Sequence, residues 1–118
     1  MNLPSAKLYF NNEHLADIDI VSYQTPFFLG RHSFFDNDLE FLLVRISEFD
    51  LSDIWLDDEL NDDEQEKKLD DLQKSLNISD EELNKYYYRH RDNWFIVMED
   101  GKKYFGFPHL DQIYIQWR

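Results

Sequence analysis

Apolar and polar residues alternate along the first part of this chain. In the segment 15–23, apolar residues flank Asp17 and Asp19, which predicts a strand with one buried and one solvated face. A shorter strand is expected over 7–10, and the polar residues 11–13 favour a turn between the two. The chain is therefore predicted to open with a strand–turn–strand unit.

The pattern changes in the next stretch. Pro26 and Gly30 interrupt the apolar residues of 25–35, so we expect a loop or a short edge strand there. Helical spacing begins near Asp36 or Asp38, where an acidic side chain can cap the first turn. The apolar stripe of this helix consists of Leu39, Leu42, Leu43, Ile46 and Phe49. Such a stripe predicts a helix that packs on the sheet.

Two further helices are predicted in the centre of the chain. The segment 62–76 has only a thin stripe of leucines, which is typical of a helix lying on the surface. Ser79 and Glu82 have the spacing of a capping box, so a third helix is expected from Asp80 to about His90. The segment 50–60, just before these helices, is ambiguous, because the side chains of Ile54, Trp55 and Leu56 could insert into the core between acidic turns.

The C-terminal third returns to a β pattern. Two apolar runs flank Asp100 and Gly101, a dipeptide that favours a hairpin. In the last segment Ile113, Ile115 and Trp117 alternate with polar or amphipathic residues and are expected on one face of a strand. The order of elements predicts a single α+β domain over 1–118. Its antiparallel sheet would have about five or six strands from both termini, with two or three central helices packed on one face.

Composition agrees with a folded domain. Of the 118 residues, 42% are hydrophobic and 17% aromatic, and there is no cysteine. Disordered chains are poor in aromatic residues, and a chain without cysteine has neither disulfides nor zinc–thiolate sites. The longest apolar runs are far too short to span a bilayer. We therefore expect a cytoplasmic protein that has no contact with membranes.

Charge is the most unusual property of the sequence. The net charge is −13, and the segment 48–82 has fifteen acidic residues against three lysines. Within it, ten of the nineteen residues from 53 to 71 are Asp or Glu. Such a field repels nucleic acid and attracts basic proteins.

The segment 53–71 is predicted to be an acidic helix–loop–helix and is the candidate partner-binding surface. It could equally be a solvated face that only keeps the protein in solution. Two properties favour binding: like charges packed together destabilise a fold, and the interleaved tryptophan is a residue type that anchors interfaces. The candidate residues are Asp53, Trp55, Asp57, Asp58, Glu59, Asp62, Asp63, Glu64, Glu66, Asp70 and Asp71.

Other chemistry finds little support in the sequence. A calcium loop starting at Asp57 would place Asp62 where glycine is needed and Lys68 where glutamate is needed, so no EF-hand is predicted. No catalytic motif, metal-ligand set or glycine-rich phosphate loop is present, so we expect no catalytic residue, metal or cofactor. The basic and aromatic residues of 86–94 are too few for a nucleic-acid footprint in so acidic a chain.

These observations favour a small acidic protein that neutralises a basic protein partner. In composition, though in no motif, the chain resembles bacterial immunity proteins that inhibit toxin nucleases. One alternative is a DNA mimic, as in phage or plasmid inhibitors of nucleic-acid-binding defence proteins. An enzyme of unknown reaction ranks lower, since acid pairs such as Asp17 and Asp19 are better explained as the wet face of a strand. The partner's identity and the oligomeric state stay open.

Overall fold

The computed structural model describes residues 4–24, 26–88 and 93–118. Its strands are β1 (Ser5–Phe10), β2 (Glu13–Gln24), β3 (Phe27–Phe34), β4 (Trp94–Met98), β5 (Lys103–Phe105), β6 (His109–Leu110) and β7 (Tyr114–Trp117). Its helical elements are α1 (Asn37–Asp50), the 3-10 turn η1 (Asp53–Leu56), α2 (Asp62–Ser75), α3 (Asp80–Leu83) and the π-helical turn η2 (Asn84–Tyr88). The chain is thus α+β, as predicted.

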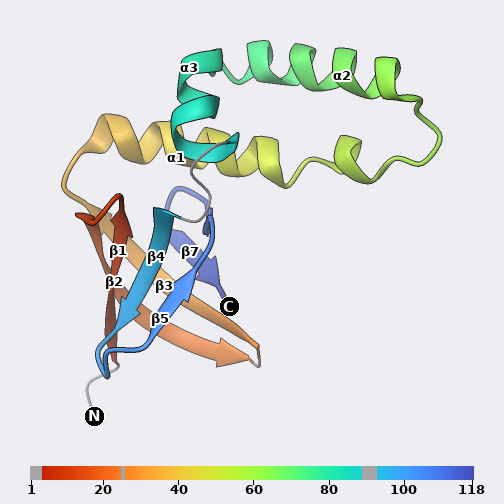
Figure 1. Ribbon diagram of the computed structural model, residues 1–118. Coiled ribbons are helices and arrows are strands. Elements are labelled where there is room, and N and C mark those ends of the chain that lie inside the picture. The colour runs from red at the N-terminus through yellow and green to blue at the C-terminus, as the bar shows by residue number, and fades with distance from the viewer. Residues whose placement is uncertain (1–3, 25, 89–92) are drawn as a thin grey trace.

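All the strands belong to one antiparallel sheet, in the order β5-β4-β1-β2-β3-β7-β6. The N-terminal strand β1 lies between β2 and β4, so the sheet does combine strands from both termini. Seven strands exceed the five or six predicted. The sheet curls on itself (Figure 1). Across the curl, the rings of Phe28 on β3 and Tyr104 on β5 make an edge-to-face contact with centroids 5.3 Å apart.

Two predictions for the sheet were wrong. Residues 27–34 form a full strand inside the sheet, between β2 and β7, because Pro26 occupies the turn before it and Gly30 lies buried in its centre. Ile113 does not share the buried face of Ile115 and Trp117: it precedes β7, in the turn after β6, and its side chain is exposed. The two-residue strand β6, which pairs with β7, was not predicted.

The strand pattern of β2 is confirmed. Ala16, Ile18 and Ile20 are buried, whereas Asp17 and Asp19 face solvent. These residues join those of β1, β4 and β7 in the core. The largest fully buried side chains there are Trp94, Phe49, Leu8, Ile18, Leu43, Ile46, Leu83, Ile96 and Ile115.

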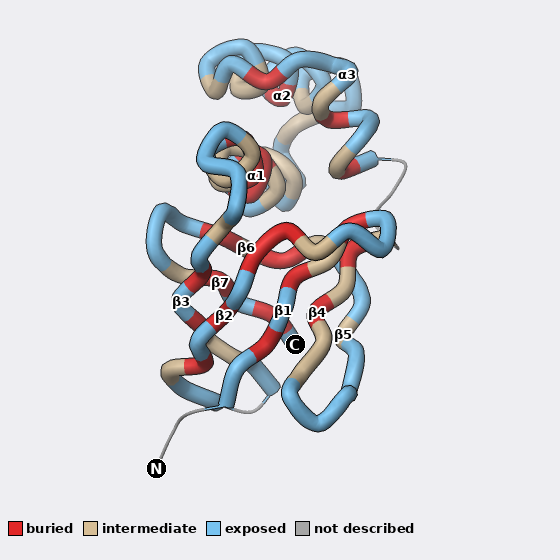
Figure 2. Tube along the Cα trace, turned by 90° about the vertical axis from the view of Figure 1, so that its left-hand side faces the viewer, coloured by how far each residue is buried: buried red, intermediate tan, exposed pale blue. Residues whose placement is uncertain are grey.

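Helix α1 connects the sheet to the rest of the helical region. As expected, an acid caps it: the Asp36 carboxylate accepts hydrogen bonds from the N–H groups of Asp38 (3.0 Å) and Leu39 (3.3 Å). Four of the predicted stripe residues are buried, and Leu39 is half-buried. In a view nearly along the axes of α1 and α2, the sheet, α1 and α2 form successive layers (Figure 2).

The central helices α2 and α3 begin where the sequence places them. Both bonds of the Ser79–Glu82 capping box form, at 2.9 and 3.1 Å. Leu83 and Tyr87 are buried, but the α-helix gives way to the π-helical turn η2 after four residues. The predicted end of this helix near His90 lies outside the described residues. Among the helices that the structure describes, none is both long and apolar enough to cross a membrane.

Gly30 provides a test of this packing. A Cβ at this position would lie 2.3 Å from Cγ2 of Ile18 and 3.2 Å from the carbonyl oxygen of Asp19. We therefore expect Gly30→Ala to lower the free energy of unfolding by about 1–3 kcal/mol, the usual effect of overpacking a core. Urea denaturation measures the change. Ser33→Ala, at an exposed position on the same strand, is the matched control, and equal urea midpoints for the two variants would contradict the close packing.

Candidate functional site

The acidic hairpin, residues 53–71, extends beyond the sheet. The chain leaves the end of α1, continues through η1, turns at the right of the view and returns through α2 (Figure 1). The molecule measures 51 × 29 × 23 Å, and its radius of gyration is 15.3 Å. A compact domain of this length would have a radius of about 13 Å. The acidic hairpin thus contributes to an elongated shape.

The first arm of the acidic hairpin is fixed to the end of α1. The Ser52 hydroxyl caps η1 by accepting a hydrogen bond from the Ile54 N–H at 3.2 Å. The indole N–H of Trp55 donates to the carbonyl oxygen of Phe49 at 3.0 Å, and the two rings meet edge to face. Trp55 is therefore half-buried against the core, while the neighbouring Leu56 is the exposed apolar residue of this arm.

The second arm is fixed to the first. The side-chain amide of Gln65 donates to the carbonyl oxygens of Ile54 (3.2 Å) and Trp55 (3.4 Å). Asn61 and Glu64 form a capping box at the start of α2, which the sequence interpretation did not identify. Leu69 is buried, so the thin leucine stripe does face inward. The acidic hairpin is held by backbone-directed hydrogen bonds rather than by a large apolar core.

The carboxylates of the acidic hairpin all lie at exposed positions. Those of Asp57 and Glu64 also cap local N–H groups. Among the ion pairs formed between described residues, none involves an acid of 53–71. Ten carboxylates thus share one projecting segment with only two lysines in it, Lys67 and Lys68. At neutral pH this segment presents an uncompensated negative field.

The pKa of Tyr88, a tyrosine of η2, depends on its burial and on nearby acids of α2 and α3. Partial burial, and then the nearby carboxylates of Asp70 and Asp80, raise the pKa of the Tyr88 phenol above its ordinary value. Both causes oppose the formation of a phenolate. The surface where α2 approaches η2 therefore disfavours a further negative charge.

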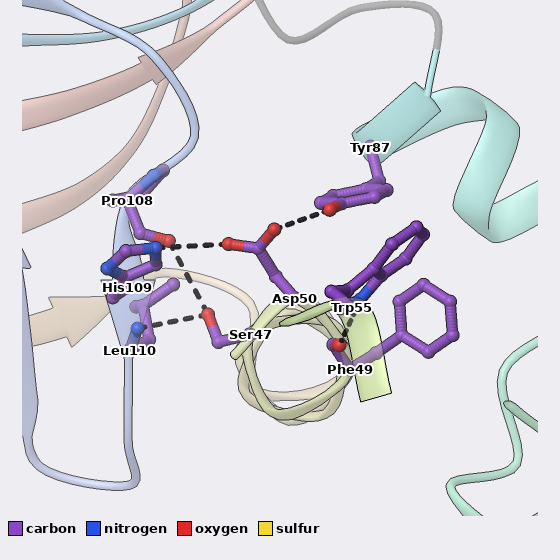
Figure 3. Close-up of polar contacts among 8 residues, drawn as sticks. All are labelled: Ser47, Phe49, Asp50, Trp55, Tyr87, Pro108, His109 and Leu110. Carbon is purple, nitrogen blue, oxygen red and sulfur yellow. Dashed lines mark hydrogen bonds and ion pairs between the residues drawn. The ribbon is translucent and has the colours of Figure 1, made fainter. Parts of the chain in front are cut away.

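The root of the acidic hairpin is a polar cluster on the last turn of α1 (Figure 3). The Asp50 carboxylate accepts a hydrogen bond from the Tyr87 hydroxyl of η2, and its other oxygen lies 3.0 Å from Nε2 of His109 on β6. The Asp50 side chain is only 13% exposed. A carboxylate this well covered requires such partners, because an unpaired buried charge is costly.

Ser47, one turn earlier on α1, extends this cluster to the sheet. Its hydroxyl, fully buried, accepts from the Leu110 N–H at 3.0 Å and donates to the Pro108 carbonyl oxygen at 3.4 Å. At the other end of α1, Glu40 approaches the buried His32 of β3, with Oε1 3.1 Å from Nδ1. The polar positions of α1 thus contact the sheet at both ends of the helix.

The sequence interpretation missed Asp50, Tyr87 and His109 as a group, because 59 positions separate the outer two. Through its contact with Asp50, His109 is a hydrogen-bonded structural histidine. Among the residues that are described, no group of three or more potential metal ligands occurs.

Comparisons with protein-family models, with curated proteins and with solved structures give no match for this chain.

Gln65 tests how the acidic hairpin is held. We expect Gln65→Ala to remove the two hydrogen bonds to η1 and to lower protection of the α2 amides against hydrogen exchange by about tenfold, the effect of one lost net hydrogen bond. Protection in β1, β2 and β4 should not change. Lys68→Ala, at an exposed position of the same helix, is the control. Unchanged exchange in α2 would show that Gln65 does not fix this arm.

Tyr87 tests the root of the acidic hairpin. Tyr87→Phe keeps the buried ring but removes the hydroxyl that donates to Asp50. Because the acceptor is a well-covered carboxylate, we expect a loss of about 1–3 kcal/mol in the free energy of unfolding. Thermal and urea denaturation measure it. Tyr88→Phe, next to it and exposed, should change stability by less than about 0.5 kcal/mol; an equal loss in both variants would contradict the role of this hydrogen bond.

Proposed function

We propose that this chain is a small acidic protein that binds a basic protein partner in the cytoplasm and neutralises it. An immunity protein against a nuclease-type bacterial toxin is the kind of inhibitor we infer. The observation that carries the proposal is the acidic hairpin: ten exposed carboxylates on η1, on α2 and in the turn between them, without an ion pair to any other described residue.

The local order of the acidic hairpin supports binding over simple solvation. A disordered acidic tail would keep a protein in solution at least as well. Here the Asn61–Glu64 capping box starts α2, Gln65 links α2 to η1, and Trp55 links η1 to α1, so the spacing of the acids is determined before any partner arrives. Charges held in place lose little conformational entropy on binding.

The mechanism follows from electrostatics. Uncompensated charge on a projecting segment attracts an oppositely charged protein over a distance of about one Debye length, roughly 8 Å at physiological salt. This attraction raises the association rate and orients the encounter. The partner would lose activity because the acidic hairpin occupies the basic surface with which a nuclease holds its nucleic acid.

Removing charge from the acidic hairpin tests the proposal. The partner is captured from extracts of the source cell on the immobilised chain, identified, purified and assayed for nuclease activity. We then expect the variant in which Asp57, Asp58, Asp62 and Asp63 are replaced by asparagine to associate about tenfold to a hundredfold more slowly. Stopped-flow fluorescence measures the rate. Raising the salt from about 0.05 M to about 0.5 M should slow the wild type similarly.

A matched variant removes four charges elsewhere: Glu13, Asp19, Asp38 and Glu99, all exposed, are replaced by the corresponding amides. It should change the association rate by less than about twofold, because salt screens charges that lie far from the contact surface. Equal effects of the two variants, or a rate indifferent to salt, would contradict binding through the acidic hairpin. Inhibition of several unrelated nucleases, rather than one partner, would favour the DNA mimic.

A further inference from the structure

An open groove lies beside the root of the acidic hairpin. It runs between the second half of α1 and the turn that joins β6 to β7, and it encloses about 660 Å³. Val44 and Glu48 line one side from successive turns of α1, together with Leu51, the C-cap residue of this helix. The other side is formed by the β6–β7 turn, including Leu110, Asp111 and Ile113.

Large apolar side chains are exposed to solvent in this groove. Leu51 is 58% exposed and Ile113 is 53% exposed, while Val44 is half-buried and Leu110 is buried beneath them. The alternation of the last segment suggested that Ile113 would enter the core, but the turn directs it outward. Large apolar side chains gathered in a concave surface are typical of a site that another molecule covers.

The β6–β7 turn is rigid in this arrangement. The Asp111 carboxylate accepts hydrogen bonds from the N–H groups of Ile113 (2.8 Å) and Tyr114 (2.6 Å). From β3, the His32 N–H donates to the Ile113 carbonyl oxygen at 3.2 Å, and the His32 ring lies 2.8 Å from the carbonyl oxygen of Asp111. The exposed position of Ile113 is therefore set by four contacts, so filling the groove needs little reorganisation.

Charge decides what the groove can receive. Among the described residues that line it, the acids Glu48 and Asp111 occur, and no lysine, arginine or histidine does. Leu51, at its edge, is followed two residues later by Asp53, the first acid of the acidic hairpin. The apolar floor of the groove thus has acidic side chains of its own and lies next along the chain to the acidic hairpin, which matches a segment with both basic and apolar side chains.

We propose that this groove receives one or two large apolar side chains from a lysine- or arginine-rich segment of the basic protein partner. This inference rests on the proposed function and assigns the two surfaces different tasks. The acidic hairpin accelerates the encounter, and the groove supplies the desolvated contact that prolongs the complex. Interfaces of this kind concentrate binding energy in a few buried apolar anchors, with charges mainly around them.

A peptide selection tests the inference without knowledge of the partner. A phage-displayed library of random peptides is selected on the full-length chain, and enriched peptides are synthesised and measured by calorimetry. We expect them to combine Lys or Arg with at least one large apolar residue. Their Kd should rise by about thirtyfold or more for the double variant Leu51→Ser and Ile113→Ser, the loss expected for an anchor worth one hot-spot contact.

The control is Phe41→Ser, which removes a similarly exposed apolar side chain of α1 outside the groove and should change Kd by less than about twofold. Circular dichroism confirms that each variant is folded. Peptides that are basic without apolar residues, or Kd values equal for the double variant and the wild type, would overturn the groove and leave the proposed function standing. Apolar peptides without basic residues would overturn the partner chemistry inferred for the groove. A selection that enriches neither kind of peptide would overturn the proposed function itself.

Discussion

The carboxylate of Asp50 is where three distant parts of the chain meet. It closes α1, holds Tyr87 of the π-helical turn and lies against His109 of β6, while Ser47 binds the backbone of that same strand one turn earlier. Because the carboxylate is mostly covered, each of these contacts offsets part of the cost of removing its charge from water. These contacts hold the end of α1 against η2 and β6, at the point from which the chain continues into the acidic hairpin.

The acidic hairpin depends on that fixed end. Its carboxylates repel one another, and only Leu69 of α2 is buried. Local contacts offset the repulsion: the Asn61–Glu64 capping box, the Gln65 amide on two carbonyl oxygens, and Trp55 on Phe49. Acids in the first turn of α2 also complement the helix dipole. A segment with so much like charge keeps an ordered shape because its hydrogen bonds are directed to its own backbone, which leaves the carboxylates turned toward solvent.

The two surfaces near the end of α1 complement each other. The acidic hairpin offers long-range attraction but little apolar area, and the groove beside Leu51 offers apolar area with an acidic rim. Charges on exposed side chains change association rates more than the lifetime of a complex, whereas buried apolar anchors do the reverse. A protein that must find a basic partner quickly and keep it inhibited needs both properties. Their adjacency on one helix end is the structural basis of the function proposed for this chain.

Local patterns in the sequence determined the α+β class, the wet and buried faces of β2, the caps of α1 and α3, the hairpin at Gly101 and the concentration of acids in 53–71. Each depends on neighbouring residues, whose spacing sets the face or the turn. Only the tertiary structure decided that residues 27–34 form an inner strand, that Ile113 turns outward, and that Asp50, Tyr87 and His109 meet. These outcomes depend on residues far apart in the chain: Gly30 fits because Ile18 lies against it, and Ile113 is exposed because His32 holds its turn. Patterns in the sequence depend on residues that are close along the chain, whereas sheet order and polar clusters depend on residues that become close only in the folded structure.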